Sequence, residues 1–248
     1  MRVRQAANVL ELVEFFAQRG EPATLAEIAD DLRWPRSSTF NLVGTLVEDG
    51  YLYEPQQRGR YFPSPKWAAL GRTLADADPL PTRLRDLVDA VCTETGETAA
   101  IGGVSGLSVV FLYVRESRQP IRYFAEVGTT VPIHASSAGR AILAQMEPKE
   151  REAIYRKLKF ERWSDTTPTS AEDVEDQLRR AESRGWHQSD SEFIADLAGV
   201  SLPVPHANRR LSLVVAGPVS RCLARRDDLA RSMRQVMDRL GVVFEGVH

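Results

Sequence analysis

The residues best suited to catalysis are His134, Ser136, Ser137 and Asp190, because a serine, a histidine and an aspartate make up a nucleophilic triad. Serines and a histidine this close together more often cap and fill the corner between a strand and a helix, and a triad is recognised by its geometry. Gly139 in the same corner suits a helix N-terminus, where free backbone N–H groups hold a carboxylate. The sequence therefore favours a binding site over a catalytic one.

Other signatures of chemistry are missing from the sequence. It contains no GxSxG, GxGxxG, P-loop or HExxH motif, and its four histidines lack metal-ligand spacing. Cys92 and Cys222 stand far apart, without a CxxC pair. We therefore expect no enzyme, no cofactor and no metal. Two alternatives stay open: a small-molecule hydrolase using the C-terminal domain with the N-terminal domain as an interaction module, and a purely structural dimerisation protein.

Side chains that suit DNA gather near residue 40 and on a following hairpin. Their hydroxyl, amide and guanidinium groups can reach phosphates and base edges, and an asparagine can pair bidentately with adenine. The candidate DNA contacts are Arg36, Ser37, Ser38, Thr39, Asn41, Arg58 and Arg60. Taken singly, the serines can also cap a helix and the arginines can be solvated, so only the whole set indicates DNA binding.

The elements that would position this set are three short helices and a hairpin. Thr24 and Glu27 have the spacing of a capping box, and Gly20 and Gly50 suit helix ends. Helices are predicted over 4–18, 24–32 and 37–49, and strands over 51–54 and 60–63. The third helix is expected to bury Phe40, Val43, Leu46 and Val47. This order is the plan of a winged helix-turn-helix whose third helix recognises DNA.

A linker separates this unit from the remaining two-thirds of the chain. Residues 65–75 predict a short helix with the apolar stripe Trp67, Leu70 and Leu74, and 76–81 is predicted to be a hinge. The expected organisation is a DNA-binding domain over 1–64, a linker helix and hinge over 65–81, and a second domain over 82–248.

The second domain mixes strands and helices in runs. Helices are predicted over 82–95, 137–146, 148–158, 170–184 and 226–241, and strands over 98–104, 107–114, 121–124, 199–204 and 211–216. Antiparallel strands with helices packed at the ends indicate an α+β sensor-like domain.

Composition restricts the class of protein. Of 248 residues, 43% are hydrophobic and the net charge is −2, which argues against disorder and against a uniformly basic nucleic-acid coat. Residues 1–75 hold equal numbers of acidic and basic side chains, so we expect modest DNA affinity for one chain and a larger one for a dimer. No apolar run is long enough to span a membrane, and the N-terminus lacks a signal-peptide core, so the expected location is the cytoplasm.

Several stretches, in order and at similar spacing, together resemble IclR-type bacterial transcriptional regulators over nearly the whole chain. In the first domain they are Leu25 to Ala29, Pro35 to Leu46 and Gly59 to Pro65. In the second domain they are Val127-Gly128, Pro132 to Ala141, Ala216 to Pro218 and Ser220-Arg221. The resemblance implies a winged helix, a linker helix that helps dimerisation, and a GAF-like effector-binding domain. It also implies a homodimer, or a dimer of dimers, that binds palindromic double-stranded operators and responds to a small organic effector, often an acid from a catabolic pathway.

Carried over position by position, the resemblance assigns DNA contact to Arg36, Ser37, Ser38 and Asn41. A basic residue is common in the family where this chain has Asn41, so adenine is favoured over guanine as the contacted base. The effector pocket maps onto Tyr123, Val131, Ile133, Ser137, Ala138, Asp190, Ser201, Val214 and Ala216.

The mapped pocket is drier than is usual in the family. Val214 and Ala216 stand where small polar residues are common, and Gly199 or Ser201 replaces a frequent cysteine. A small, very polar acid would leave its own groups unpaired there, at about 1–3 kcal/mol each. An aromatic or otherwise apolar acid is therefore the expected effector. The hinge and the linker helix are the parts expected to carry its effect to the DNA, since an effector must favour one arrangement of the domains.

Overall fold

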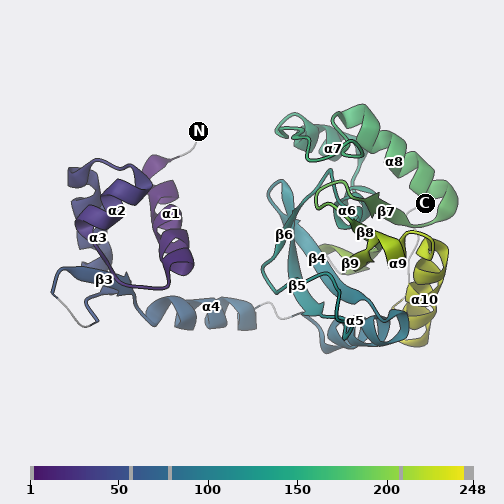
Figure 1. The fold of residues 1–248 in the computed structure, drawn as a ribbon, viewed down its shortest axis with the longest axis horizontal. Helices are drawn as coiled ribbons and strands as arrows, with labels where there is room; N and C mark the ends of the chain where they lie inside the picture. The colour runs from purple at the N-terminus through teal and green to yellow at the C-terminus, as the bar shows by residue number, and fades with distance from the viewer. Residues whose placement is uncertain (1–2, 56–57, 78–79, 207–208, 243–248) are drawn as a thin grey trace. The chain divides into compact units, whose positions relative to one another are not determined.

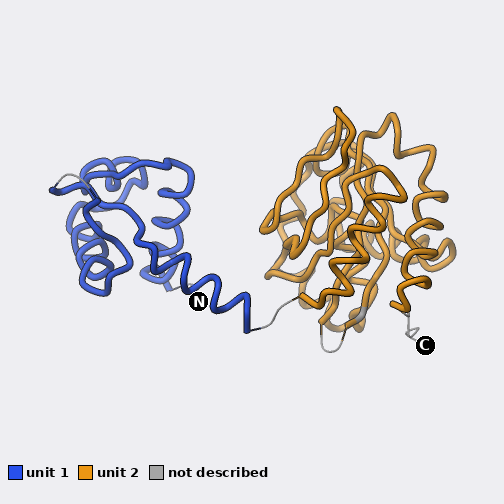
Figure 2. The backbone as a smooth tube through the Cα atoms, turned by 90° about the horizontal axis from the view of Figure 1, so that it is seen from below, with its two compact units in different colours: residues 1–79 blue, residues 80–248 orange. Residues whose placement is uncertain are grey.

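The computed structural model describes residues 3–55, 58–77, 80–206 and 209–242. The chain divides into two compact units, residues 1–79 and 80–248 (Figure 2).

The first unit is a three-helix domain with a small sheet. Its helices are α1 (Arg4–Arg19), α2 (Leu25–Leu32) and α3 (Arg36–Glu48), and a fourth helix, α4 (Lys66–Ala77), follows the sheet (Figure 1). The strands β1 (Ala23–Thr24), β2 (Leu52–Tyr53) and β3 (Arg60–Pro63) pair antiparallel in the order β1-β3-β2. The predicted winged helix-turn-helix is confirmed.

Local signals explain where these helices begin and end. The Thr24 hydroxyl accepts the Glu27 N–H at 3.2 Å, and the Glu27 carboxylate accepts the Thr24 N–H at 2.8 Å. These bonds are the largest cause of a Glu27 pKa lowered to about 2. Gly20 ends α1 with a φ of 69°, a left-handed conformation that glycine adopts without strain.

The buried face of α3 differs from the sequence prediction at several positions. The prediction was right for Val43 and Leu46 but wrong for Phe40 and Val47, which are exposed. Thr39 is fully buried instead, and its hydroxyl donates to the Pro35 carbonyl at 3.2 Å, which satisfies the polar group inside the core. Burial at 39, 43 and 46 follows one side of the helix, and Phe40 lies outside it.

The linker helix extends two residues beyond its predicted end. Asp76 and Ala77, expected in the hinge, belong to α4, and 78–79 lie outside the described residues. No residue of α4 is buried, although the Trp67 indole N–H donates to the Tyr51 carbonyl at 3.0 Å. This bond joins the start of α4 to the sheet region of the first unit.

The second unit is built on a six-stranded antiparallel sheet of order β6-β5-β4-β9-β8-β7. Its strands are β4 (Thr98–Ser105), β5 (Ser108–Arg115), β6 (Thr130–Pro132), β7 (His187–Asp190), β8 (Leu197–His206) and β9 (Arg209–Pro218). Its helices are α5 (Thr82–Thr95), α6 (Ser137–Leu143), α7 (Pro148–Tyr155), α8 (Ala171–Arg184), α9 (Val219–Cys222) and α10 (Arg226–Arg239).

Two apolar cores lie on the two faces of this sheet. Helices α5 and α10 cover one face, and α6 and α8 lie with α7 on the other side (Figure 1). The α+β class and most predicted elements of this unit are confirmed.

The strand predicted over 121–124 is wrong. Ile121 and Phe124 are exposed, and the edge of β5 is occupied by β6 instead. The 121–124 segment is held differently, with the Thr98 hydroxyl donating to the Tyr123 carbonyl at 2.7 Å. Strands β6 and β7 and helix α9 were not predicted; each is three or four residues long, too short for a clear period.

Candidate functional site

The first candidate surface is the start of α3, in the first unit. Arg36, Ser37, Ser38 and Asn41 are all exposed there, as a recognition helix requires. Arg36 approaches Asp30 only to 4.0 Å, and both side chains are mostly exposed, so its guanidinium is available. Phe40 adds an apolar group to this surface with 64% of its area exposed.

Two predicted DNA contacts are placed differently. Thr39 is wrong as a contact, because it is buried and its hydroxyl is bound within the helix. Arg60 lies on β3 and donates to the Pro22 carbonyl at 2.7 Å and to Glu27 at 3.4 Å, so it holds the sheet against α2. Arg58, in the turn of the hairpin, is exposed.

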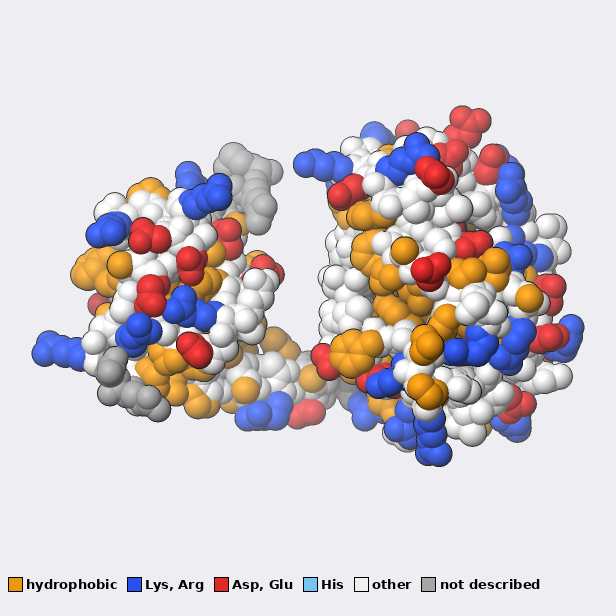
Figure 3. Space-filling model, in the orientation of Figure 1, with side chains coloured by type: hydrophobic (Ala, Val, Ile, Leu, Met, Phe, Trp, Pro, Cys, Tyr) orange, Lys and Arg blue, Asp and Glu red, His pale blue; other side chains and the backbone are white. Residues whose placement is uncertain are grey.

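Charge is balanced over this unit. Basic and acidic side chains are interspersed on the face drawn in Figure 3. Any attraction of DNA phosphates therefore depends on local cations such as Arg36 and Arg58 rather than on a basic coat.

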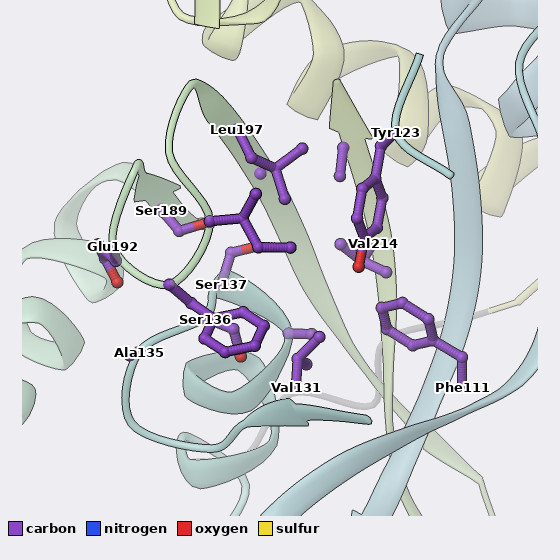
Figure 4. Close-up of a pocket in the computed structure, with 15 residues that line it drawn as sticks. Phe111, Tyr123, Val131, Ala135, Ser136, Ser137, Ser189, Glu192, Leu197 and Val214 are labelled. Atoms are coloured by element: carbon purple, nitrogen blue, oxygen red, sulfur yellow. The ribbon is translucent and has the colours of Figure 1, made fainter. Parts of the chain in front are cut away.

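The second candidate site is a pocket in the second unit between the sheet and α6, here called the inner pocket. Its walls come from β5 to β9, the segment that carries Tyr123, the corner before α6 with the start of that helix, and the 191–196 segment. It is lined by Phe111, Tyr123, Val131, Ala135, Ser136, Ser137, Ala138, Ser189, Glu192, Phe193, Ile194, Leu197, Gly199, Val214 and Ala216. Phe111 and Tyr123 stand on one side and Ser189 and Glu192 on the other (Figure 4). The pocket therefore offers an aromatic wall opposite a polar one.

Six of the nine predicted effector residues line this pocket, and three do not. Those in the lining are Tyr123, Val131, Ser137, Ala138, Val214 and Ala216. Ile133 lies in the apolar core, and Asp190 lies at the end of β7 with its carboxylate accepting the Ser191 hydroxyl at 3.1 Å. Ser201 is fully buried behind the lining and donates to the Ser137 hydroxyl at 2.9 Å.

Gly199 keeps the polar side of the pocket open. A Cβ at this position would lie 2.6 Å from the Ser137 hydroxyl and 2.7 Å from the Ser189 hydroxyl. Because such contacts are too short, any side chain here would displace the two serines. The glycine therefore lets both hydroxyls approach the strand.

A buried ion pair supports the same side. Arg140 of α6 is fully buried and binds both carboxylate oxygens of Glu192, at 2.7 and 2.9 Å. The same guanidinium donates to the carbonyls of His134, at 2.9 Å, and of Gln188. Burial raises the pKa of Glu192, and the Arg140 charge opposes that rise. The pair joins α6 to the segment that closes the pocket.

The triad residues are not assembled for catalysis. His134 packs against Phe160 and Trp163, with ring centroids at 5.3 and 5.6 Å. Ser136 donates to the Pro132 carbonyl at 2.6 Å and accepts the Gly139 N–H at 3.1 Å, which caps α6. Within the described residues no hydrogen bond joins His134 to a serine, so the geometry gives the hydrolase alternative no support.

In the part of the chain that the structure describes, no cluster of three or more His, Cys, Asp or Glu side chains is arranged to hold a metal ion. No helix among 3–55, 58–77, 80–206 and 209–242 has both the length and the apolar character to cross a membrane.

Sequence reasoning missed several lining residues. The strand period could have identified Phe111 as an inward-facing residue, because Phe111 follows Val109 at the two-residue period of β5 and both are buried. No local sequence pattern identifies Glu192, Phe193 and Ile194 as lining residues, because their position depends on the pairing of β7 with β8.

Comparisons with known proteins agree over nearly the whole chain. Residues 73–240 match the family model described as bacterial transcriptional regulator IclR C-terminal, and residues 5–55 match the IclR helix-turn-helix domain. The HTH-type transcriptional regulator BhcR of Paracoccus denitrificans is 27% identical, covering 82% of this chain and 72% of that protein.

Solved structures share the fold. An IclR family transcriptional regulator from Brucella abortus aligns with a TM-score of 0.73 at 24% identity, over 97% of this chain and 92% of that one. An IclR homologue from Microbacterium hydrocarbonoxydans, crystallised with 4-hydroxybenzoate, aligns with a TM-score of 0.69 at 20% identity, over 96% of this chain and 100% of that one.

Proposed function

The chain belongs to the IclR family of bacterial transcriptional regulators, and from this premise we propose that it binds a specific operator through α3 and releases or holds it according to a small aromatic acid in the inner pocket. The division of labour follows the expected domains, 1–64 for DNA, 65–81 as linker and 82–248 for the effector. Operator binding is expected to take place in the cytoplasm, where bacterial DNA lies.

The exposed start of α3 is the observation that supports DNA binding. Asn41 can pair bidentately with an adenine in the major groove, and the exposed ring of Phe40 beside it suits a thymine methyl group. Arg36, Ser37 and Ser38 provide donors for phosphates. We propose an operator half-site with an A·T pair under this part of the helix.

The lining of the inner pocket supports an aromatic acid. Phe111 and Tyr123 offer flat apolar contact, and Ser137 and Ser189 offer hydroxyls on the opposite side. The homologue crystallised with 4-hydroxybenzoate shows that a chain of this fold accommodates such a molecule. The free volume here is about 40 Å³, little more than one water molecule occupies, so the pocket has to widen when an effector enters.

The exposed stripe on α4 supports a homodimer. Leu70 and Leu74 are large apolar side chains left exposed on a helix that buries none of its residues. A second copy covering this stripe would remove apolar surface from water. Two recognition helices about 34 Å apart would then contact half-sites one helical turn apart on a palindromic operator. Two such dimers can associate into a dimer of dimers.

Selection from genomic DNA tests the proposal. The purified protein is incubated with fragments of its own genome at several salt concentrations, with and without metabolite extract, and bound fragments are sequenced. We expect a roughly palindromic site. Sequence-blind binding that vanishes with salt in every condition would overturn the proposal.

Variants then test the assigned surface. Arg36→Ala combined with Asn41→Ala should abolish selection while the second unit stays folded by circular dichroism. Arg4→Ala with Asn8→Ala, the same residue types on α1, is the matched control and should select the same site. Equal losses in both variants would contradict the role of α3.

A further inference from the structure

A second cavity lies beside the inner pocket. It is bordered by the start of β5, by β6, by the 157–163 segment after α7 and by Phe193, and is here called the outer cavity. Its volume is about 440 Å³, within the range of about 300–1,000 Å³ typical of small-molecule sites. The inner pocket, at about 40 Å³, is far smaller. In the described structure the outer cavity is therefore large enough for an aromatic ligand as it stands.

The two cavities share part of their walls. Val131 and Phe193 line both of them. A ligand in the outer cavity would thus contact two of the side chains that line the inner pocket. Phe193 follows Glu192 directly, and Glu192 is held by Arg140. The Thr167 hydroxyl also donates to the Glu192 carbonyl at 2.5 Å, so the backbone of the shared wall is fixed on one side.

Aromatic rings form one side of the outer cavity. The Trp163 ring meets Phe193 edge to face with centroids 5.2 Å apart, and it lies 5.6 Å from the His134 ring. Burial lowers the pKa of His134, with the Glu161 backbone opposing and the Arg140 charge adding to the effect, so the imidazole is neutral near pH 7. The three rings therefore offer flat, uncharged surface for stacking.

The charge of the outer cavity is positive. Lys157 and Lys159, two of only four lysines in the chain, belong to its lining, which contains no Asp or Glu. Both are exposed, and neither has an ion-pair partner among the interactions of the described residues. Glu161 lies outside the lining, although its carboxylate is near enough to His134 for its charge to act on that ring. Two unpaired ammonium groups beside aromatic walls suit a ligand with a ring and a carboxylate.

We propose that the outer cavity is a second binding site for an aromatic carboxylate, held by Lys157 and Lys159 at its charged end and by Trp163 and Phe193 at its ring. The inference deepens the proposed function in one respect, the class of ligand, and adds a site distinct from the inner pocket. Because Phe193 and Val131 are shared, occupation of the outer cavity changes the wall against which an inner ligand packs.

Benzoate is the probe, titrated into the full-length protein without DNA while tryptophan fluorescence is recorded. Benzyl alcohol is the uncharged comparison. We expect saturable quenching by benzoate in the millimolar range, as suits so small a ligand. The signal should disappear in Trp163→Phe and persist in Trp186→Phe, since Trp186 lies in the other core.

The charged end has its own matched variants. Lys157→Gln with Lys159→Gln should weaken benzoate about 2- to 30-fold and leave benzyl alcohol unchanged, whereas Lys149→Gln on α7 should change neither. Failure of benzoate to bind, quenching that survives Trp163→Phe, or equal affinity in the lysine variants would overturn the second site. None of these results depends on operator selection, so the second site can fail while the proposed DNA binding stands, and the reverse.

Discussion

Removing one partner of the Arg140–Glu192 pair should destabilise the second unit, and removing both should cost less than the two single losses added together. Arg140 has no exposed surface, and Glu192 is nearly as buried. Arg140→Met leaves a carboxylate, and Glu192→Met leaves a guanidinium, without its counter-charge. Each single change should lower the free energy of unfolding by about 3–5 kcal/mol, because an uncompensated charge is left in the interior.

The double variant carries no charge at either of these two buried positions. It still removes the donor to the carbonyls of His134 and Gln188, at about 1–3 kcal/mol for each group left unpaired. The loss in the double variant is therefore about 2–6 kcal/mol, against about 6–10 kcal/mol if the single losses added. The midpoints of these two ranges, about 4 and about 8 kcal/mol, differ by about 4 kcal/mol, which is the coupling energy we expect between the two positions.

Urea unfolding followed by circular dichroism measures these losses, with separate transitions fitted for the two units. Arg231 and Asp228 provide the matched control, since their ion pair has the same 2.7 Å distance but both side chains are mostly exposed. Their cycle should give a coupling of about 0.2–1 kcal/mol. Additive losses at Arg140 and Glu192, or a coupling no larger than the control, would refute the reasoning.

Two further predictions concern packing and pH. Gly139→Ala should destabilise the second unit by more than about 1–3 kcal/mol in urea unfolding, because a Cβ there overlaps the Ile133 backbone. Gly44→Ala, which has open space around the new Cβ, should stabilise α3 slightly. Equal effects of the two substitutions would contradict this reasoning. Burial, aided by the charges of Arg140 and Arg184, lowers the pKa of His187 from 6.5 to about 3, so the folded state stays neutral while the unfolded state gains a proton as pH falls below 6.5. The free energy of unfolding should therefore fall by about 1.4 kcal/mol as the pH falls from about 7.5 to about 5.5. His187→Asn, measured over the same range, should lose that part of the pH dependence. If the free energy of unfolding of the variant changed with pH as much as that of the unchanged protein, His187 would not be the source of the effect.

The fold of the first unit was predictable because its signals are local. The capping box of Thr24 and Glu27 and the left-handed Gly20 mark helix ends within four residues of sequence. The side of α3 that faces the core is not local information. It depends on how the helix rotates against α1 and α2, and a rotation by one position exchanges Thr39 for Phe40 in the core.

The inner pocket was predictable only in part, for a related reason. The resemblance located the corner before α6 and the end of β9, which supplied Ser137, Ala138, Val214 and Ala216. Ser201 lies on the predicted strand, but it does not line the pocket, because its hydroxyl bonds to Ser137 behind the lining. Glu192 and Phe193 come from a segment whose position is set by the pairing of β7 with β8, and no local sequence pattern predicts that pairing.

The two cavities differ in how far function can be separated from stability. Around the inner pocket, Ser137 bonds to Ser201 and Arg140 to Glu192, so residues more than fifty positions apart hold the wall and the fold together. A substitution there changes the shape of the pocket and the free energy of unfolding at once. Lys157 and Lys159 are exposed and hold no other element in place. Their exchange should therefore alter ligand affinity at constant stability, which makes the outer cavity the cleaner place to test how a ligand acts on this protein.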